Sequence, residues 1–191
     1  MSYNIAIIYG SVRTNRQGIK AAEYIYRDLA EKGHSVTLID PKIYELPLID
    51  KMYKEFPTGE APEPLGQLHT ILEQSDAFII VTGEYNHGIP PALSNLMDHF
   101  QSEYLYKPSA IVSYSAGIFG GVRAMFALRA FLAELGTSSI PSTLPIGKIG
   151  SAFDEDINPT DPKFAKRYTR FISEFFWYTE ALKTQREKKR E

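Results

Sequence analysis

Short apolar runs alternate along this chain with longer segments that have the 3.6-residue period of helices. An uninterrupted apolar run of this length, rich in β-branched residues, is typical of a strand that is buried on both faces of a parallel sheet. A weaker fifth strand is expected within 138–147, broken by Pro141 and Pro145. The four clearer strands are expected at residues 4–9, 35–39, 77–82 and 109–114.

The segments between these runs predict helices. The first has Ile19, Ala22, Ile25 and Leu29 at helical spacing and is expected to stop at Gly33. Strand and helix therefore alternate five times, which predicts an α/β fold with a doubly wound, five-stranded parallel sheet flanked by helices. The remaining helices are expected at about 65–72, 90–106, 121–135 and 161–186.

Size and composition limit the possible functions. The 191 residues fit one domain, 1–191, which is large enough to bury a stable core without disulfides or structural metal ions. Cysteine is absent, which excludes disulfides, thiolate metal sites and cysteine nucleophiles, so redox chemistry needs a cofactor. A net charge of −2 does not indicate nucleic-acid binding, and no apolar run approaches the length of a membrane span. Since no secretory signal is recognised, we expect a cytoplasmic protein.

Two segments fall outside the alternation of strands and helices. Residues 41–64 contain five prolines and are too long for a plain connection, so they form either a functional flap or a locally ordered insertion. The final run, KTQREKKRE, has mixed charge and is expected to be the solvated end of the last helix.

Three loops carry the unusual residues of this sequence. They follow the first, third and fourth strands, at 10–18, 82–91 and 113–121. In a doubly wound sheet, ligands bind outside the carboxyl ends of the strands. We therefore expect the three loops to face one another around a ligand.

The first loop, YGSVRTNRQG, has the features of an anion receptor. Ser11 offers a hydroxyl donor, and the amides up to Ile19 lie at the N-terminus of the next helix. Arg13 and Arg16 add guanidinium groups that suit phosphate. The sequence has neither a Walker lysine nor the three-glycine dinucleotide pattern here, so a monophosphate fits best. The alternative is an ordinary polar turn with surface arginines.

The other two loops, TGEYNHGIPP and SYSAGIFGG, are suited to a planar ligand. Gly83 allows the backbone to approach such a ligand closely, and the amides around Tyr85 and Asn86 are placed to hydrogen-bond its edge. Alternatively, Tyr85 only packs at the rim of the ligand site. His87 is expected to be exposed rather than catalytic. Gly117 either allows a second close approach of the backbone to this ligand or belongs to a flexible segment that leads into the next helix.

Together these motifs resemble those of the NADPH-dependent FMN reductase family, which has a flavodoxin-like fold with strand order 2-1-3-4-5. The resemblance spans roughly residues 3–150. One departure is Gly83, at a position where the family usually has proline. The motifs that carry the resemblance are GSVRTNRQG, LPLID, GEYNHGIPPALSNLMDH and SYSAGIFGGVRAMFALRAFLAELG.

The resemblance implies that FMN is the bound cofactor. The positions that match the family's phosphate-binding residues are Ser11, Arg13, Arg16, Gly18 and Ile19. The positions that match the surroundings of the isoalloxazine ring are Glu84, Tyr85, Asn86, Ser115 and Gly117.

The resemblance also implies an oxidoreductase. NADPH or NADH is expected to give a hydride to FMN and leave before a small acceptor takes its place, in a ping-pong reaction. Acceptors in the family include flavins, quinones, azo compounds and metal ions. Because the cofactor carries the chemistry, neither a catalytic residue nor a metal site is expected. The alternatives are a non-enzymatic FMN-binding electron carrier and a sensor that has lost turnover.

A homodimer or homotetramer is expected as the working unit. One domain of this size leaves part of a bound flavin exposed, and family members resembling this chain form dimers or tetramers. Large aromatic side chains outside the predicted core stripes are expected to pack against a second subunit, and packing against the last helix is the alternative. These aromatic residues are Tyr104, Tyr106, Phe126 and Phe131.

Overall fold

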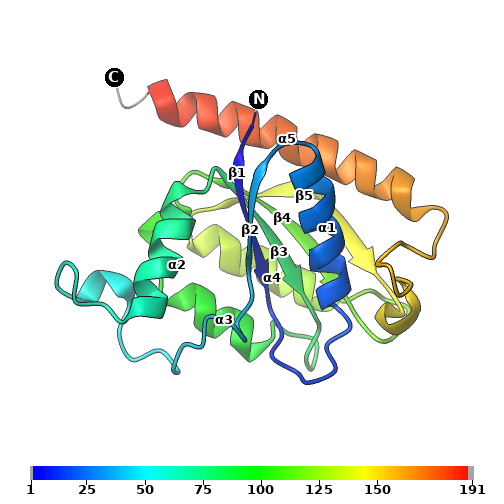
Figure 1. Cartoon of the computed structure of the whole chain (residues 1–191), viewed down its shortest axis with the longest axis horizontal. Helices are drawn as coiled ribbons and strands as arrows, with labels where there is room; N and C mark the ends of the chain where they lie inside the picture. Colours follow the sequence, from blue (N-terminus) through cyan, green and yellow to red (C-terminus); the bar gives the residue numbers. More distant parts are fainter. Residues whose placement is uncertain (1, 189–191) are drawn as a thin grey trace.

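The computed structural model describes residues 2–188, which form one parallel sheet with helices on both faces (Figure 1). The strand order is β2-β1-β3-β4-β5, which confirms the predicted topology. Three strands have the predicted bounds, and β4 begins one residue earlier. The strands are β1 (Asn4–Tyr9), β2 (Ser35–Ile39), β3 (Ala77–Thr82), β4 (Pro108–Tyr114) and β5 (Ser138–Ile146).

Five α-helices and three short 3-10 helices connect the strands. The α-helices are α1 (Ile19–Glu31), α2 (Glu63–Gln74), α3 (Pro91–Asp98), α4 (Val122–Glu134) and α5 (Phe164–Lys188). The 3-10 helices are η1 (Tyr53–Glu55), η2 (Ser102–Tyr104) and η3 (Ile149–Ser151).

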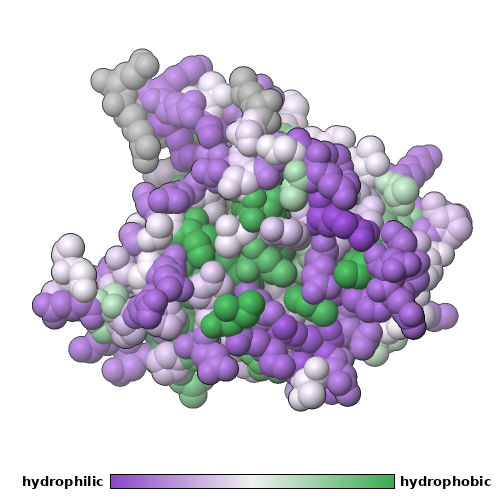
Figure 2. Space-filling model, viewed as in Figure 1, coloured by the Kyte–Doolittle hydropathy of each residue, from purple (hydrophilic) through white to green (hydrophobic). Residues whose placement is uncertain are grey.

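The two faces of the sheet are covered by different helices. Helices α1 and α5 pack on one face, and α2, α3 and α4 pack on the other, so each face has its own buried apolar cluster. Every residue of β3 and β4 is buried, as expected for central strands of a doubly wound sheet. Figure 2 shows further apolar residues over the outer strand β2, between α1 and α2, with polar residues around them.

Strand β5 runs from Ser138 to Ile146 without ending at either proline, so the expected break at Pro145 is wrong, whereas the pairing with β4 is irregular around Pro141. It is an outer strand that pairs with β4, and proline is tolerated in outer strands because fewer ladder donors are needed there. Its pairing register shifts between Ser109 and Ile111 of β4. The carbonyl of Pro141 accepts a hydrogen bond from Arg129 at 2.7 Å, and that of Pro145 accepts one from Arg167 at 3.0 Å.

The predicted helix 90–106 is wrong beyond Asp98. The backbone of Gln101 is not helical, with φ −145° and ψ −64°, and its N–H donates to Glu103 Oε2 at 2.9 Å. The spacing of Phe100 and Tyr104 imitates a helical stripe, although a turn and η2 bury both rings. Tyr104 therefore belongs to the core, and its expected place at a subunit contact is also wrong.

The proline-rich segment 41–64 is ordered and lies against the core. Its apolar side chains, Tyr53 among them, pack on the cluster beneath α2 and α3. The N–H of Ile49 donates to Asn95 Oδ1 at 2.9 Å, and that of Tyr53 donates to the His99 carbonyl at 2.8 Å. Of the two interpretations, the structure favours a locally ordered insertion.

Helix α5 begins three residues later than predicted and continues to Lys188, and residues 189–191 of the charged run lie outside the described part. The run is not merely solvated, because Lys183 pairs with Asp76 at 2.9 Å and Arg186 donates to the Tyr106 carbonyl at 2.9 Å. None of the helices within residues 2–188 combines the length and apolar surface that crossing a bilayer requires.

Candidate functional site

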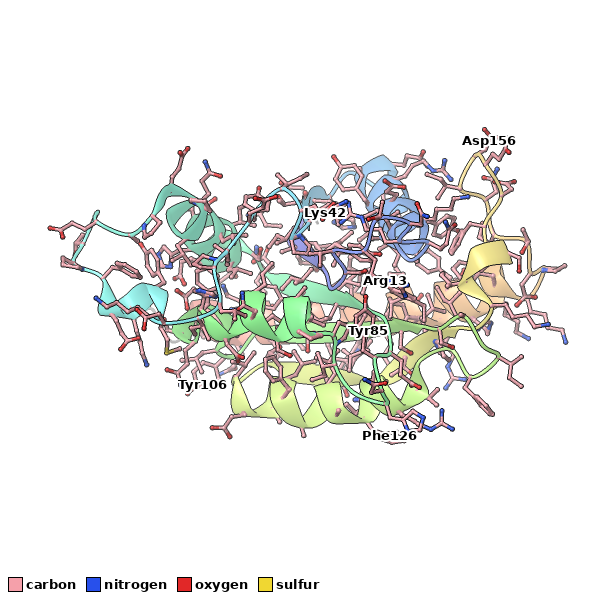
Figure 3. All side chains as sticks on the ribbon, turned by 90° about the horizontal axis from the view of Figure 1, so that it is seen from below. Arg13, Lys42, Tyr85, Tyr106, Phe126 and Asp156 are labelled. Carbon is pink, nitrogen blue, oxygen red and sulfur yellow. The ribbon has the colours of Figure 1, made fainter. Side chains whose placement is uncertain are left out.

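The loops that follow β1, β3 and β4 meet at the carboxyl edge of the sheet. Figure 3 views the molecule from this side, with Arg13 and Tyr85 near the centre. The hydroxyl oxygens of Ser11 and Tyr85 are 3.5 Å apart. Glu84, which precedes Tyr85, bonds the first amides of α4. The structure thus brings the three predicted loops together.

Residues 10–18, which we call the anion loop, present a series of unpaired backbone donors. The N–H of Gly10 ties the loop to the Val81 carbonyl at 3.0 Å, and the N–H of Arg13 points to Ser11 Oγ at 3.4 Å. The N–H groups of residues 14–18 donate no hydrogen bond within the described chain. The amide of Ile19 instead turns back to the Arg16 carbonyl at 3.5 Å. The unpaired amides therefore lie in the loop, ahead of α1, and the amide of Ile19 is not among them.

The two arginines of the anion loop have different surroundings. Arg13 is exposed, and within residues 2–188 its guanidinium makes no hydrogen bond or ion pair. Arg16 forms a two-pronged ion pair with Asp40, donates to the Ser11 carbonyl at 3.0 Å and lies over the Tyr9 ring. Arg13 is thus the cation of this loop that is available to an external anion, while Arg16 retains its Nε–H and one Nη2–H.

Asp40 was missed in the sequence analysis. It directly follows β2, the neighbour of β1 in the sheet, and its side chain is 6% exposed. The hydrogen bond from Arg16 to Asp40 raises the pKa of the guanidinium, so Arg16 stays charged. The available signal was its position, because a carboxylate at the carboxyl end of a neighbouring strand lies close to the arginines of the first loop.

Tyr114, also missed, supports the anion loop from below. A Cβ atom on Gly18 would lie 2.1 Å from Tyr114 Cζ, and one on Gly83 would lie 3.1 Å from Tyr114 Cε2. The Tyr114 hydroxyl donates to the Tyr9 hydroxyl at 3.2 Å, and burial raises the pKa of both phenols. Gly18 is therefore required by packing against this ring, and Gly83 leaves room for the same ring.

The loop after β3 contains a tight turn at residues 85–88. The N–H of Tyr85 donates to the Gly88 carbonyl at 3.1 Å, and the N–H of Gly88 donates back at 2.9 Å. Asn86 and His87 have positive φ angles of 49° and 64°, as in a type I′ turn, and both are exposed. The turn holds Tyr85 beside the anion loop, with its hydroxyl 3.5 Å from that of Ser11, and the contact of Tyr85 and Asn86 with a planar ligand stays a prediction.

The carboxylate of Glu84 points to α4. Its Oε2 accepts hydrogen bonds from the N–H groups of Arg123 at 3.0 Å and Ala124 at 3.4 Å. A carboxylate at a helix N-terminus satisfies unpaired donors and interacts favourably with the helix dipole. In this structure Glu84 fixes the loop after β3 against the loop after β4.

The loop after β4 presents small and apolar groups. Ser115 Oγ donates to the Gly117 carbonyl at 3.1 Å, and this carbonyl also accepts the N–H of Lys148 at 2.8 Å. A Cβ atom on Gly117 would meet nothing within 4 Å. Ile118 and Phe119 are more than half exposed, so the loop forms an apolar rim, and Arg123 links it to the loop after β3 by lying over the Phe119 ring and pairing with Glu84.

Comparison with known proteins places this arrangement in a family. The sequence matches the NADPH-dependent FMN reductase family over residues 3–150. The chain belongs to this family. A quinone reductase of Pseudomonas putida is 34% identical over 139 residues, which cover 70% of this chain and 71% of that protein.

Other members of the FMN reductase family and a solved structure agree with this assignment. An NAD(P)H-dependent FMN reductase of Saccharomyces cerevisiae is 30% identical over 174 residues, covering 81% of this chain and 87% of that one. The structure of FerB, a flavoenzyme NAD(P)H:(acceptor) oxidoreductase from Paracoccus denitrificans, has a TM-score of 0.77 at 27% identity, covering 94% of this chain and 98% of that chain. The predicted family, flavodoxin-like fold and oxidoreductase class are thereby confirmed.

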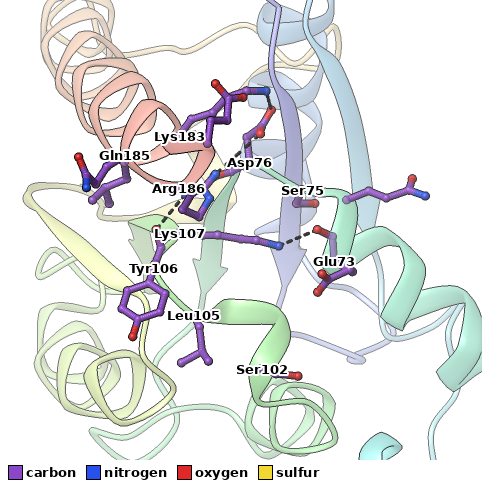
Figure 4. Close-up of a pocket in the computed structure, with 13 residues that line it drawn as sticks. Glu73, Ser75, Asp76, Ser102, Leu105, Tyr106, Lys107, Lys183, Gln185 and Arg186 are labelled. Carbon is purple, nitrogen blue, oxygen red and sulfur yellow. Dashed lines mark hydrogen bonds and ion pairs between the residues drawn. The ribbon is translucent and has the colours of Figure 1, made fainter. Parts of the chain in front are cut away.

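The part that matches the FMN reductase family contains all ten predicted site residues and ends before α5. Where α5 crosses the amino ends of the strands, a pocket of about 630 Å³ lies far from the anion loop (Figure 4). Lys107 at this pocket donates to the carbonyls of Leu72 and Glu73, both at 2.8 Å, which completes the end of α2. Lys183 pairs with Asp76. These internal partners indicate docking of α5 rather than a ligand site.

Proposed function

We propose that residues 1–191 form one FMN-binding domain of a cytoplasmic NAD(P)H oxidoreductase. The observation that carries the proposal is the anion loop, in which five consecutive unpaired amides and the free Arg13 guanidinium stand beside the turn at 85–88. Exposed amides and a guanidinium bind phosphate oxygens well. The distance between loop and turn is small enough for one ligand to contact both, since Ser11 and Tyr85 approach within 3.5 Å.

The residues of this site fit FMN in two groups. The phosphate is assigned to Ser11, Arg13, Arg16, Gly18 and Ile19, with Arg13 as the main charge and the unpaired amides of 14–18 as donors. The Ile19 amide would have to leave its long 3.5 Å contact with the Arg16 carbonyl to join them. The isoalloxazine ring is assigned to Glu84, Tyr85, Asn86, Ser115 and Gly117, with Glu84 acting through the backbone that its carboxylate fixes.

FMN supplies the hydride chemistry when it is bound, taking a hydride from the nicotinamide and passing electrons to the acceptor. The protein residues bind and orient. Burial raises the pKa of Tyr9 and of Tyr114, so these two phenols stay neutral and themselves add no negative charge beneath the anion loop. Among residues 2–188 there is no group of three or more His, Asp or Glu side chains that could hold a metal ion.

The acceptor is proposed to be a small planar molecule or a metal ion. Relatives are described as a quinone reductase and an NADPH azoreductase, which supports quinones, azo compounds or flavins as substrates. Ile118 and Phe119 offer an apolar rim for such a ring, with Arg123 stacked on Phe119 at 5.1 Å. NADPH or NADH would bind at the same place before the acceptor, in a ping-pong order.

We also propose that a second copy of the chain completes the site, in a homodimer or homotetramer. Phe126 on α4 is 69% exposed and supports this contact. Tyr106 is also exposed, at 63%, but it lies at the pocket beside α5, far from the anion loop. Phe131 is partly buried against the core cluster beneath α4. An exposed apolar rim beside a shallow flavin site is suited to cover by a partner subunit.

The decisive experiment compares FMN and riboflavin binding to Arg13→Ala. A charge-assisted hydrogen bond contributes about 1.5–3 kcal/mol, so FMN should bind roughly 10- to 150-fold more weakly, while riboflavin affinity changes little. Arg170→Ala, which removes an exposed arginine on α5, is the control and should bind both flavins like the wild type. Equal losses for FMN and riboflavin in a fluorescence titration would show that Arg13 does not meet the phosphate.

A spectroscopic measurement separates the enzyme from its alternatives. The purified chain should be yellow with flavin absorbance, and NADPH or NADH should bleach that absorbance under argon. Bound flavin that neither nucleotide bleaches would identify an electron carrier or a sensor instead.

A further inference from the structure

Asp40 lies at the end of β2, next to the anion loop, and its side chain and carbonyl both bond to other residues of the chain. Both carboxylate oxygens accept hydrogen bonds from Arg16, and Oδ1 also accepts the N–H of Lys42 at 2.9 Å. The Asp40 carbonyl accepts the N–H groups of Ile43 at 2.9 Å and Tyr44 at 3.0 Å. The residue therefore joins the end of β2, the start of the segment 41–64 and the anion loop.

Through Arg16, this carboxylate sets the direction of the loop backbone. One Nη1–H of Arg16 goes to Asp40 and the other goes to the Ser11 carbonyl at 3.0 Å. With that carbonyl held inward, its lone pairs face the guanidinium and not the solvent side where a phosphate would lie. A carbonyl oxygen pointing at a phosphate would repel it, whereas the loop amides attract it.

We propose that Asp40 is a positioning residue for the phosphate site, acting through Arg16 on the anion loop. This inference rests on the proposed function, since it concerns the same FMN phosphate. Asp40 makes no contact with the ligand itself. Its role is to hold Arg16 in the orientation that binds the Ser11 carbonyl and so keeps this carbonyl away from the unpaired amides of 14–18.

The sign of the effect distinguishes this role from simple electrostatics. Asp40 is a negative charge near a site for an anion, so charge counting predicts that its removal strengthens FMN binding. Removal would also release Arg16, which then becomes a second free cation. The positioning role predicts the opposite, because the released guanidinium no longer holds the Ser11 carbonyl.

The test uses Asp40→Asn, Arg16→Lys and the double variant in the full chain stripped of flavin. Asp40→Asn keeps the shape of the side chain, and Arg16→Lys keeps the charge but loses the two-pronged geometry. Each single variant should weaken FMN binding by roughly tenfold, as expected for breaking one coupled pair, and the double variant should be no weaker than either. Riboflavin affinity should stay within about twofold of the wild type in all three.

Asp161→Asn is the matched control. It also removes a carboxylate that pairs with an arginine, Arg167 at 2.9 Å, but this pair is nearly half exposed and far along the chain from the anion loop. Exposed pairs contribute little, so FMN and riboflavin should bind as in the wild type. Thermal melting of each apoprotein checks the fold. If Asp40→Asn does not fold, Asp40→Glu carries the test, because it keeps the charge and changes the geometry of the pair with Arg16, so that only the positioning role predicts weaker FMN binding.

Each outcome decides between the two proposals. If the wild type binds no FMN, the proposed function and the role of Asp40 both fail. If the wild type binds FMN and Asp40→Asn binds it equally or more tightly, the role of Asp40 fails and the proposed function stands. Additive losses in the double variant, or equal losses of FMN and riboflavin, would also overturn the positioning role.

Discussion

Replacing Gly18 by alanine tests the packing beneath the anion loop. The backbone of Gly18 is in the right-handed helical region, with φ −65° and ψ −15°, where alanine is favoured over glycine by about 0.4–1 kcal/mol. The new methyl group, however, would lie 2.1 Å from Cζ of Tyr114 and 2.4 Å from Cε1. Ordinary carbon contacts lie near 3.5 Å, so the ring or the loop must move by roughly 1.4 Å.

The Tyr114 ring has little freedom to move away. Its hydroxyl is bonded to Tyr9, its ring is stacked on that of Tyr9 with centroids 6.4 Å apart, and Gly83 lies against it. Overpacking at such a site costs about 1–3 kcal/mol, which outweighs the backbone gain. We expect a net loss of about 1–2 kcal/mol, which lowers the melting temperature by about 2–8 °C.

The assay is urea or thermal unfolding of the apoprotein, followed by FMN titration. Gly117→Ala is the control, because its methyl group would meet nothing within 4 Å, and it should be neutral or slightly stabilising. Gly18→Ala should also bind FMN more weakly, since the loop is displaced. A Gly18→Ala protein as stable as the Gly117→Ala protein would refute the packing argument.

Three further results are expected. Because burial lowers the pKa of Lys107 from 10.5 to about 8, the folded chain releases this proton at a lower pH than the unfolded chain, so the contribution of Lys107 to the unfolding free energy should rise between about pH 8 and 10.5. Urea unfolding of the wild type and of Lys107→Met at pH 7.5 and at pH 9.5 measures this contribution as the difference between the two unfolding free energies. A difference that does not change with pH contradicts the expected rise. If donor and acceptor bind in turn at one place, double-reciprocal plots against NADPH at several quinone concentrations should be parallel, whereas intersecting lines indicate a ternary complex. Light scattering at micromolar concentration should give two or four chain masses, and a constant mass near 21.6 kDa with full activity rules out the proposed assembly.

The strands could be predicted from the sequence because parallel strands are buried on both faces. The runs at 4–9 and 77–82 are almost wholly apolar, and the structure places strands with the same bounds there. The run at 35–39 is also a strand with the predicted bounds, although Ser35 and Thr37 alternate with apolar residues and this outer strand is mostly half-buried. The helix at 90–106 could not be predicted correctly, because Phe100 and Tyr104 satisfy the helical period while Gln101 leaves the helical conformation. The spacing of apolar residues reports which positions are buried, and a turn can bury residues at the same spacing as a helix.

The location of the candidate site could be predicted from the sequence, but several of the side-chain contacts within it could not. Glycines and hydroxyl groups after β1, β3 and β4 indicated the loops, and the topology then required them to meet. The pairing of Arg16 with Asp40 joins positions 24 residues apart in different strands' loops, and the stacking of Tyr114 beneath Gly18 joins positions still further apart. Such contacts depend on where side chains from different loops point. The spacing of apolar residues along the sequence does not contain this information.

The outer strand β5 restricts how copies of this chain can associate. Sheets grow when a strand from another molecule bonds to an open edge, and such growth also leads to aggregation. Along β5, Pro141 and Pro145 provide no N–H donor, and their carbonyls are already taken by guanidinium groups from α4 and α5. A strand laid along this edge would find few partners at the two prolines, so we expect no stable assembly of this chain to extend its sheet through β5.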